Sequence, residues 1–81
     1  MTNRQKIMME DEINIIQRKI VEAMNYMQAA NCFGREEEAQ RWSDRVDEEM
    51  TRMNGVRIAL SVLGYDLGWK DNKRIIISAG A

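Results

Sequence analysis

The tetrapeptide Asn31-Cys32-Phe33-Gly34 interrupts a chain of 81 residues whose two flanking segments both carry apolar side chains at alternating steps of three and four residues. That spacing places the apolar side chains on one stripe of an α-helix, as at the a and d positions of a heptad. The stripe before the break contains Met9, Ile13, Ile16, Ile20, Ala23, Met27 and Ala30. The stripe after it contains Ala39, Trp42, Val46, Met53, Val56, Leu60 and Leu63. The pattern predicts two long helices that fold back on each other as an antiparallel hairpin, in a mainly α fold.

Local signals give the bounds of the expected elements. Thr2 or Asn3 is a suitable N-cap for the first helix, and Asn31 and Gly34 can both adopt the left-handed backbone conformation that ends a helix. Gly64 provides the same kind of stop after the second helix. We expect one domain over 1–81, with a helix over about 3–30, a turn at 31–35, a helix over about 36–63 and a β-hairpin over about 65–78.

Beyond the second helix the periodicity changes from helical to alternating, which is typical of strands. Tyr65, Leu67 and Trp69 fall on one side, Asp71-Asn72 has turn chemistry, and three consecutive isoleucines follow. This segment predicts a short β-hairpin. Because a two-stranded hairpin alone is marginally stable in water, we expect it to pack on the helices or to extend a sheet with another chain.

Glu49 interrupts the apolar stripe of the second helix. Antiparallel pairing of the helices about the break puts Glu49 at the level of Ile20. We expect its carboxylate to extend outward toward Arg45 or Arg52. The alternative is a buried polar group that sets the register of the two helices.

The composition excludes several functional classes. Twelve basic and thirteen acidic side chains, interspersed along the chain, give a net charge of −1, which disfavours both nucleic-acid binding and a DNA-mimicking surface. No apolar run approaches the roughly 20 residues of a membrane-spanning helix, so we expect no membrane partner. A single cysteine and an N-terminal segment without the apolar core of a secretory signal indicate a reducing compartment, and we expect a cytoplasmic protein.

The two helices carry more apolar side chains than one seam can bury. Those outside or beside the seam are Ile7, Met8, Ile15, Val21, Met24, Ile58 and Val62. At roughly 25 cal/mol per Å², leaving them in water forfeits free energy comparable to the whole stability of a small domain. We therefore expect two or more hairpins to assemble into a four-helix-bundle type of oligomer, with these seven residues contacting another copy or another protein. The alternative is that the β-hairpin covers part of this surface within one chain.

No catalytic, cofactor-binding or metal-binding pattern stands out. The chain has no histidine, the commonest general base and metal ligand, so we expect no enzymatic activity, no cofactor and no metal site. Cys32 has no basic partner fixed beside it by the sequence and is typical of a loop thiol. The seven methionines are typical of core filling, the alternative being an adaptable surface for an apolar partner.

One group of residues is a candidate ligand site. Aromatic and cationic side chains come together near the expected hairpin turn, a combination that can stack a nucleotide base and hold a phosphate. With two further aromatic residues, the candidates are Trp42, Tyr65, Trp69, Lys70, Lys73 and Arg74. The alternative is that the lysines protect a strand edge from aggregation.

These observations favour a non-enzymatic, oligomeric protein–protein interaction module. The alternative is an oligomeric small-molecule or nucleotide-sequestering protein, in which association completes pockets around the six candidate ligand residues. The proline-free helical hairpin, with its Leu-Gly-Tyr-Asp-Leu segment at 63–67 and its β-hairpin tail, resembles the short accessory proteins of phages and bacterial mobile elements. That resemblance implies a role as an inhibitor or regulator of a host protein.

Overall fold

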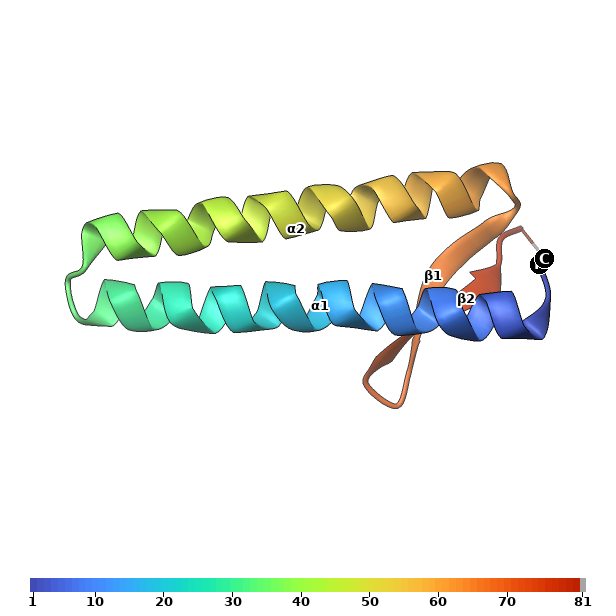
Figure 1. The fold of residues 1–81 in the computed structure, drawn as a ribbon, viewed down its shortest axis with the longest axis horizontal. Coiled ribbons are helices and arrows are strands. Elements are labelled where there is room, and N and C mark those ends of the chain that lie inside the picture. Colours follow the sequence, from blue (N-terminus) through green and yellow to red (C-terminus); the bar gives the residue numbers. More distant parts are fainter. Residues whose placement is uncertain (81) are drawn as a thin grey trace.

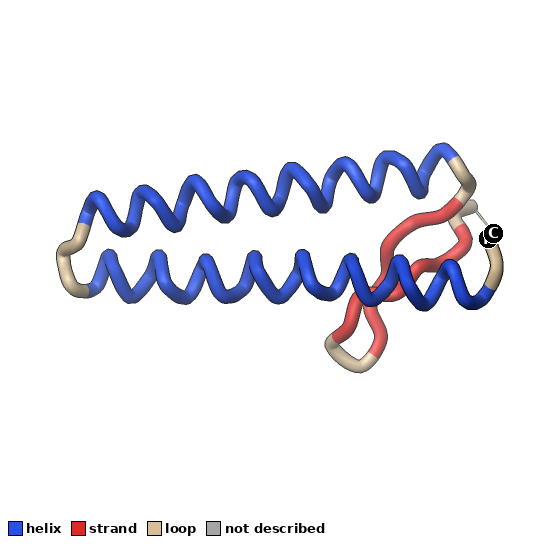
Figure 2. Tube along the Cα trace, viewed as in Figure 1, coloured by secondary structure: helices blue, strands red, loops and turns tan. Residues whose placement is uncertain are grey.

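Two long helices and a two-stranded sheet make up the fold (Figure 1). The computed structural model describes residues 1–80. Its elements, in chain order, are α1 (Asn3–Cys32), α2 (Glu36–Val62), β1 (Tyr65–Lys70) and β2 (Lys73–Ser78). The helices run antiparallel, and the strands cross the helical pair near the end that holds the N-terminus (Figure 2). The predicted mainly helical hairpin with a short C-terminal β-hairpin is therefore confirmed, and the β-hairpin packs on the helices of its own chain.

Backbone capping ends α1 two residues later than predicted. Gly34 has a φ of +70°, and its N–H donates to the Asn31 carbonyl at 3.2 Å. The next N–H, that of Arg35, reaches back to the Ala30 carbonyl at 2.9 Å, which completes a Schellman turn. Asn31 stays within the helix, so only the glycine of the two predicted left-handed residues adopts that conformation.

The other helix ends follow the predicted signals. The Thr2 hydroxyl accepts a hydrogen bond from the Gln5 N–H at 3.1 Å, and the Gln5 side-chain oxygen accepts one from the Thr2 N–H at 3.0 Å. This reciprocal pair is a capping box. Gly64, with a φ of +85°, follows α2 and turns the chain directly into β1.

The turn of the β-hairpin is formed by Asp71 and Asn72, which both have positive φ, 52° and 65°. Two such residues in succession give the type I′ geometry that matches the twist of antiparallel strands. The register pairs Leu67 with Ile76. Because side chains alternate along a strand, Ile76 enters the core while Ile77 remains 41% exposed.

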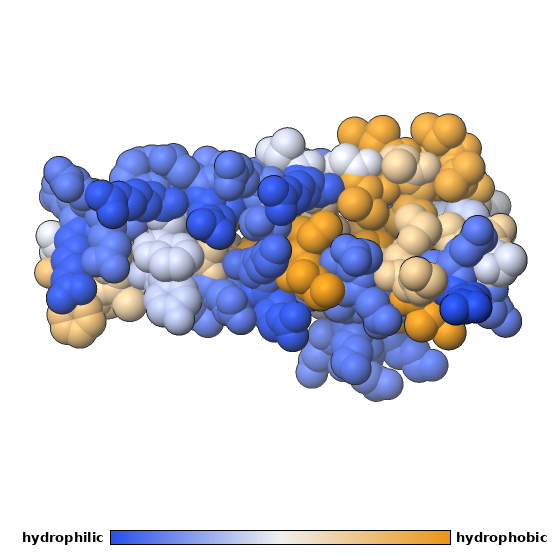
Figure 3. Space-filling view, in the orientation of Figure 1, coloured by the Kyte–Doolittle hydropathy of each residue, from blue (hydrophilic) through white to orange (hydrophobic). Residues whose placement is uncertain are grey.

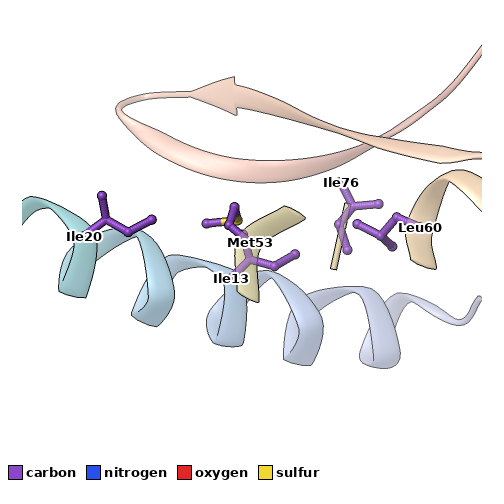
Figure 4. Close-up of a cluster of buried hydrophobic side chains, with 5 residues drawn as sticks. All are labelled: Ile13, Ile20, Met53, Leu60 and Ile76. Carbon is purple, nitrogen blue, oxygen red and sulfur yellow. The ribbon is translucent and has the colours of Figure 1, made fainter. Parts of the chain in front are cut away.

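Ile76 completes the core at the point where the hairpin crosses the helices (Figure 4). It is 1% exposed and lies in one cluster with Ile13 of α1 and Leu60 of α2, which are 1% and 0% exposed. Ile20 and Met53 extend the cluster along the seam. Since three layers of the chain meet only here, the best-buried large side chains are confined to one half of the molecule.

Asn14 fastens the hairpin to α1. Its Nδ2 donates to the Arg74 carbonyl at 3.0 Å, and its Oδ1 accepts from the Arg74 N–H at 2.8 Å. Both backbone groups of Arg74 therefore point away from β1, and the amide occupies the place of a missing neighbouring strand. Sequence reasoning missed this contact, because its partners lie 60 residues apart.

Replacing Asn14 with Ala removes both hydrogen bonds and leaves a partly buried N–H and carbonyl of Arg74 without partners. At roughly 1 to 3 kcal/mol per unsatisfied group, we expect Asn14→Ala to lower the free energy of unfolding by about 2 kcal/mol. Urea denaturation measures the loss, with Asn25→Ala, at an exposed position of the same helix, as the matched control. Equal effects of the two substitutions would contradict the role of Asn14.

The predicted outward position of Glu49 is wrong. The residue is 2% exposed, because position 49 shares a face of α2 with Val46 and Met53, and helix geometry carries the carboxylate into the seam. Its Oε1 accepts a hydrogen bond from Arg52 Nη1 at 3.3 Å, so one of the two expected partners is correct. Its Oε2 has no hydrogen-bond partner among residues 1–80. The burial in the alternative is confirmed, and the role of Glu49 in setting the register stays a prediction.

Replacing a buried, incompletely paired charge with an apolar side chain of similar size is often stabilising. We expect Glu49→Met to raise the free energy of unfolding by about 1 to 3 kcal/mol. Urea denaturation at neutral pH tests this, and Glu48→Met, an exposed neighbour, should change stability little. If Glu49→Met lowers stability instead, Oε2 has a donor in solution that the single chain does not provide.

Candidate interaction surfaces

The molecule is elongated and exposes an unusually large surface. The Cα radius of gyration is 15.2 Å and the extents are 47 × 24 × 20 Å, whereas a compact globule of this length has a radius of about 12 Å. Its accessible area is 6263 Å², whereas a compact monomer of this mass exposes about 5,000 Å². The single chain therefore exposes about a quarter more surface than a compact protein of its size.

All seven residues predicted to contact another molecule are exposed in the single chain. Their exposed fractions range from 37% for Ile15 to 81% for Val62. The β-hairpin does not cover them, contrary to the alternative considered from the sequence. Further large apolar side chains that sequence reasoning did not single out, such as Phe33, Met50 and Leu63, are also exposed.

Hydrophobic side chains gather at one end of the molecule (Figure 3). They lie over the C-terminal part of α2 and the N-terminal part of α1, while the end with the helix–helix turn is mostly hydrophilic. The sequence of α2 explains the difference. Positions 36–48 contain eight charged residues, whereas positions 53–63 contain one, Arg57.

A hollow between the helices at this end forms what we call the methionine groove. It has a volume of about 390 Å³ and shares Met8 and Met9 with a neighbouring hollow of about 570 Å³, whose lining includes Tyr65 at the start of the hairpin. Both are lined mostly by apolar side chains. The lining consists of Met8, Met9, Glu12, Ile13, Ile16 and Val56, and then of Met1, Gln5, Leu63 and Tyr65.

A separate hollow, which we call the arginine pocket, lies where the hairpin meets the helices. Its volume is about 400 Å³. An apolar floor is rimmed by amides and guanidinium groups, and the lining consists of Gln17, Ile20, Met24, Met50, Met53, Asn54, Arg57, Leu67 and Arg74. Arg57 Nε donates to Asp66 Oδ1 at 3.3 Å, and Arg74 Nε donates to Gln17 Oε1 at 3.5 Å. Sequence reasoning missed Arg57, because its partner follows nine residues later across a helix–strand junction.

The methionine groove and the arginine pocket lie on opposite faces of the helical pair. Successive residues of an α-helix are about 100° apart around its axis. On α1 this places Met8 and Glu12 on roughly the opposite side from Asn14 and Gln17, which both contact Arg74 of β2. The methionine groove therefore belongs to the face without the hairpin, and the arginine pocket to the face with it.

Four of the six candidate ligand residues lie close together on the hairpin. Trp69 and Arg74 are opposite each other in the register, and the guanidinium carbon lies 4.0 Å from the centroid of the indole ring. Lys70 and Lys73 form the next pair, beside the turn. This arrangement gathers the positive charge that the sequence predicted, but Arg74 covers one face of the aromatic ring on which a base would stack.

The remaining two candidates lie elsewhere. Tyr65 packs against the hydrophobic core. Trp42 stacks on Tyr26, with ring centroids 4.7 Å apart and an interplanar angle of 22°. Tyr26 is nine residues, or about 13 Å of helix, beyond the Gln17 side chain that contacts the hairpin. The fold of one chain therefore does not assemble the six candidates into a single site.

Within residues 1–80, no three His, Cys, Asp or Glu side chains are grouped so that they could hold a metal ion. In the same part of the chain, no helix has the length and apolarity needed to cross a membrane. Cys32 is exposed at the end of α1.

No protein-family model, curated protein or solved structure matches this chain.

Proposed function

We propose that this chain is a non-enzymatic protein-interaction module that works as an oligomer. The observation that carries the proposal is the exposed apolar surface: seven large side chains on two helices, each at least 37% exposed. Exposed apolar patches of this kind mark surfaces that contact another molecule. The absence of histidine from the sequence supports a binding role over a catalytic one.

The size of the surface supports self-association. The chain exposes about 1,200 Å² more than a compact monomer of its mass. A stable interface covers about 800 Å² on each partner. One interface of ordinary size would therefore cover about two thirds of this excess surface, and a four-helix bundle of two hairpins is the simplest arrangement.

The arginine pocket supports a second, different partner. Its floor offers Met24 and Met50, whose flexible side chains adapt to varied apolar shapes. Its rim offers guanidinium groups that bind carboxylates. A protein segment with neighbouring apolar and acidic side chains fits this chemistry. With the resemblance to phage accessory proteins, we propose that the partner is a bacterial protein that the module inhibits or regulates in the cytoplasm.

Nucleotide sequestration has weaker support. A base would have to compete with Arg74 for Trp69, and with Tyr26 for Trp42. The positive charge at the hairpin turn is also balanced in part by Asp71.

Light scattering at micromolar concentration tests self-association. We expect a solution mass of about twice the 9.5 kDa of one chain or a higher multiple. The mass should fall toward 9.5 kDa on dilution, because association depends on concentration. A mass of 9.5 kDa over the whole micromolar range would contradict the proposal.

A further inference from the structure

We infer that a second copy of this chain covers the methionine groove, with the twofold axis parallel to the helices, so that both helix–helix turns lie at the same end of a four-helix bundle. The inference rests on the proposed self-association and adds to it the face and the orientation.

The face follows from the position of the hairpin. On one side of the helical pair, Ile76 is inserted over Ile13 and Leu60, and all three are at most 1% exposed. A second helical pair cannot reach the seam from that side without displacing β2. On the other side no helix or strand of residues 1–80 lies over the seam, and Met8 and Leu63 are 61% and 64% exposed. Only this free face offers both helices to a flat partner.

The orientation follows from the distribution of charge along that face. A twofold interface brings the same patch of both copies together. An axis parallel to the helices places the methionine groove of one copy on that of the other. An axis across the helices, through the middle of the molecule, places it on positions 36–48 of α2. There the 100° step of the helix puts the charged residues Glu38, Arg45 and Glu48 on the same side of α2 as Val56 of the groove. Charged side chains are costly to desolvate against apolar surface, so the first arrangement is favoured.

The single charged residue of positions 53–63 does not disturb this packing. Arg57 bonds to Asp66 of β1 and lines the arginine pocket, on the hairpin side of the seam. At the edge of the groove, Glu12 has no ion-pair partner within residues 1–80. In the proposed dimer it lies opposite α2 of the other copy, where Arg52, 60% exposed, is about one helical turn away. The charge at the edge is therefore complementary.

Cys32 makes the orientation measurable without any mutation. It is the only cysteine of the chain, it is exposed, and it lies at the turn end of α1. A nitroxide label on Cys32 reports the distance between copies by double electron–electron resonance. With neighbouring helices 8–10 Å apart, we expect the two labels to be separated by less than about 30 Å, including their arms.

A distance near or above the 47 Å length of the molecule would overturn the inferred orientation. The measurement also separates the two proposals. A dimeric mass with a long distance leaves self-association intact and refutes the arrangement. A monomeric mass refutes the proposed function, and the inference with it.

A pair of exposed apolar residues tests the face. Met8 and Ile77 are 61% and 41% exposed, but only Met8 lines the methionine groove, and Ile77 belongs to β2 on the hairpin side. We expect Met8→Glu to raise the dimer dissociation constant at least tenfold and Ile77→Glu to leave it nearly unchanged. Circular dichroism checks that both variants keep the fold. Equal weakening by the two substitutions, or weakening by Ile77→Glu alone, would contradict the groove as the interface.

Discussion

Two helices that share one seam bury only the stripe that each turns toward the other, and this geometric limit controls the rest of the structure. Here the seam is about 30 residues long, yet the β-hairpin covers only part of one of its faces. Ile76 supplies the third layer and converts that part into a core. The hairpin covers no more than this part of residues 1–80, so apolar side chains that point away from it, such as Met8 and Val62, stay in water.

The hairpin also makes the two faces of the helical pair different. Asn14 holds β2 against α1 on one face, and the arginine pocket forms beside that contact. The other face carries the methionine groove, on which we propose that another pair of helices packs. The packing of the hairpin on one face thus distinguishes the surface proposed for self-association from the surface proposed for a different protein. The proposed function depends on that division.

Local chemistry made much of this fold predictable. Heptad spacing predicted both helices, Gly34 and Gly64 predicted where they stop, and Asp71-Asn72 predicted the hairpin turn. The errors arose where a residue's environment depends on distant parts of the chain. Glu49 is buried because helix geometry places it in the seam, against the expectation from its charge.

The sites were less predictable than the fold for the same reason. Exposure of the seven apolar residues followed from counting side chains against the capacity of one seam. That Met8 lines the methionine groove and Met24 the arginine pocket did not, because it depends on which side the hairpin occupies. The contacts of Asn14 with Arg74 and of Arg57 with Asp66 define that side, and neither pair has a helical or strand spacing.

Paramagnetic relaxation enhancement of the methionine methyl resonances by a soluble agent tests most directly whether a second chain covers the free face. The Met8 and Met9 methyl groups should become shielded as concentration rises while Met50, on the hairpin face, stays accessible; equal accessibility of all three at every concentration would contradict the account.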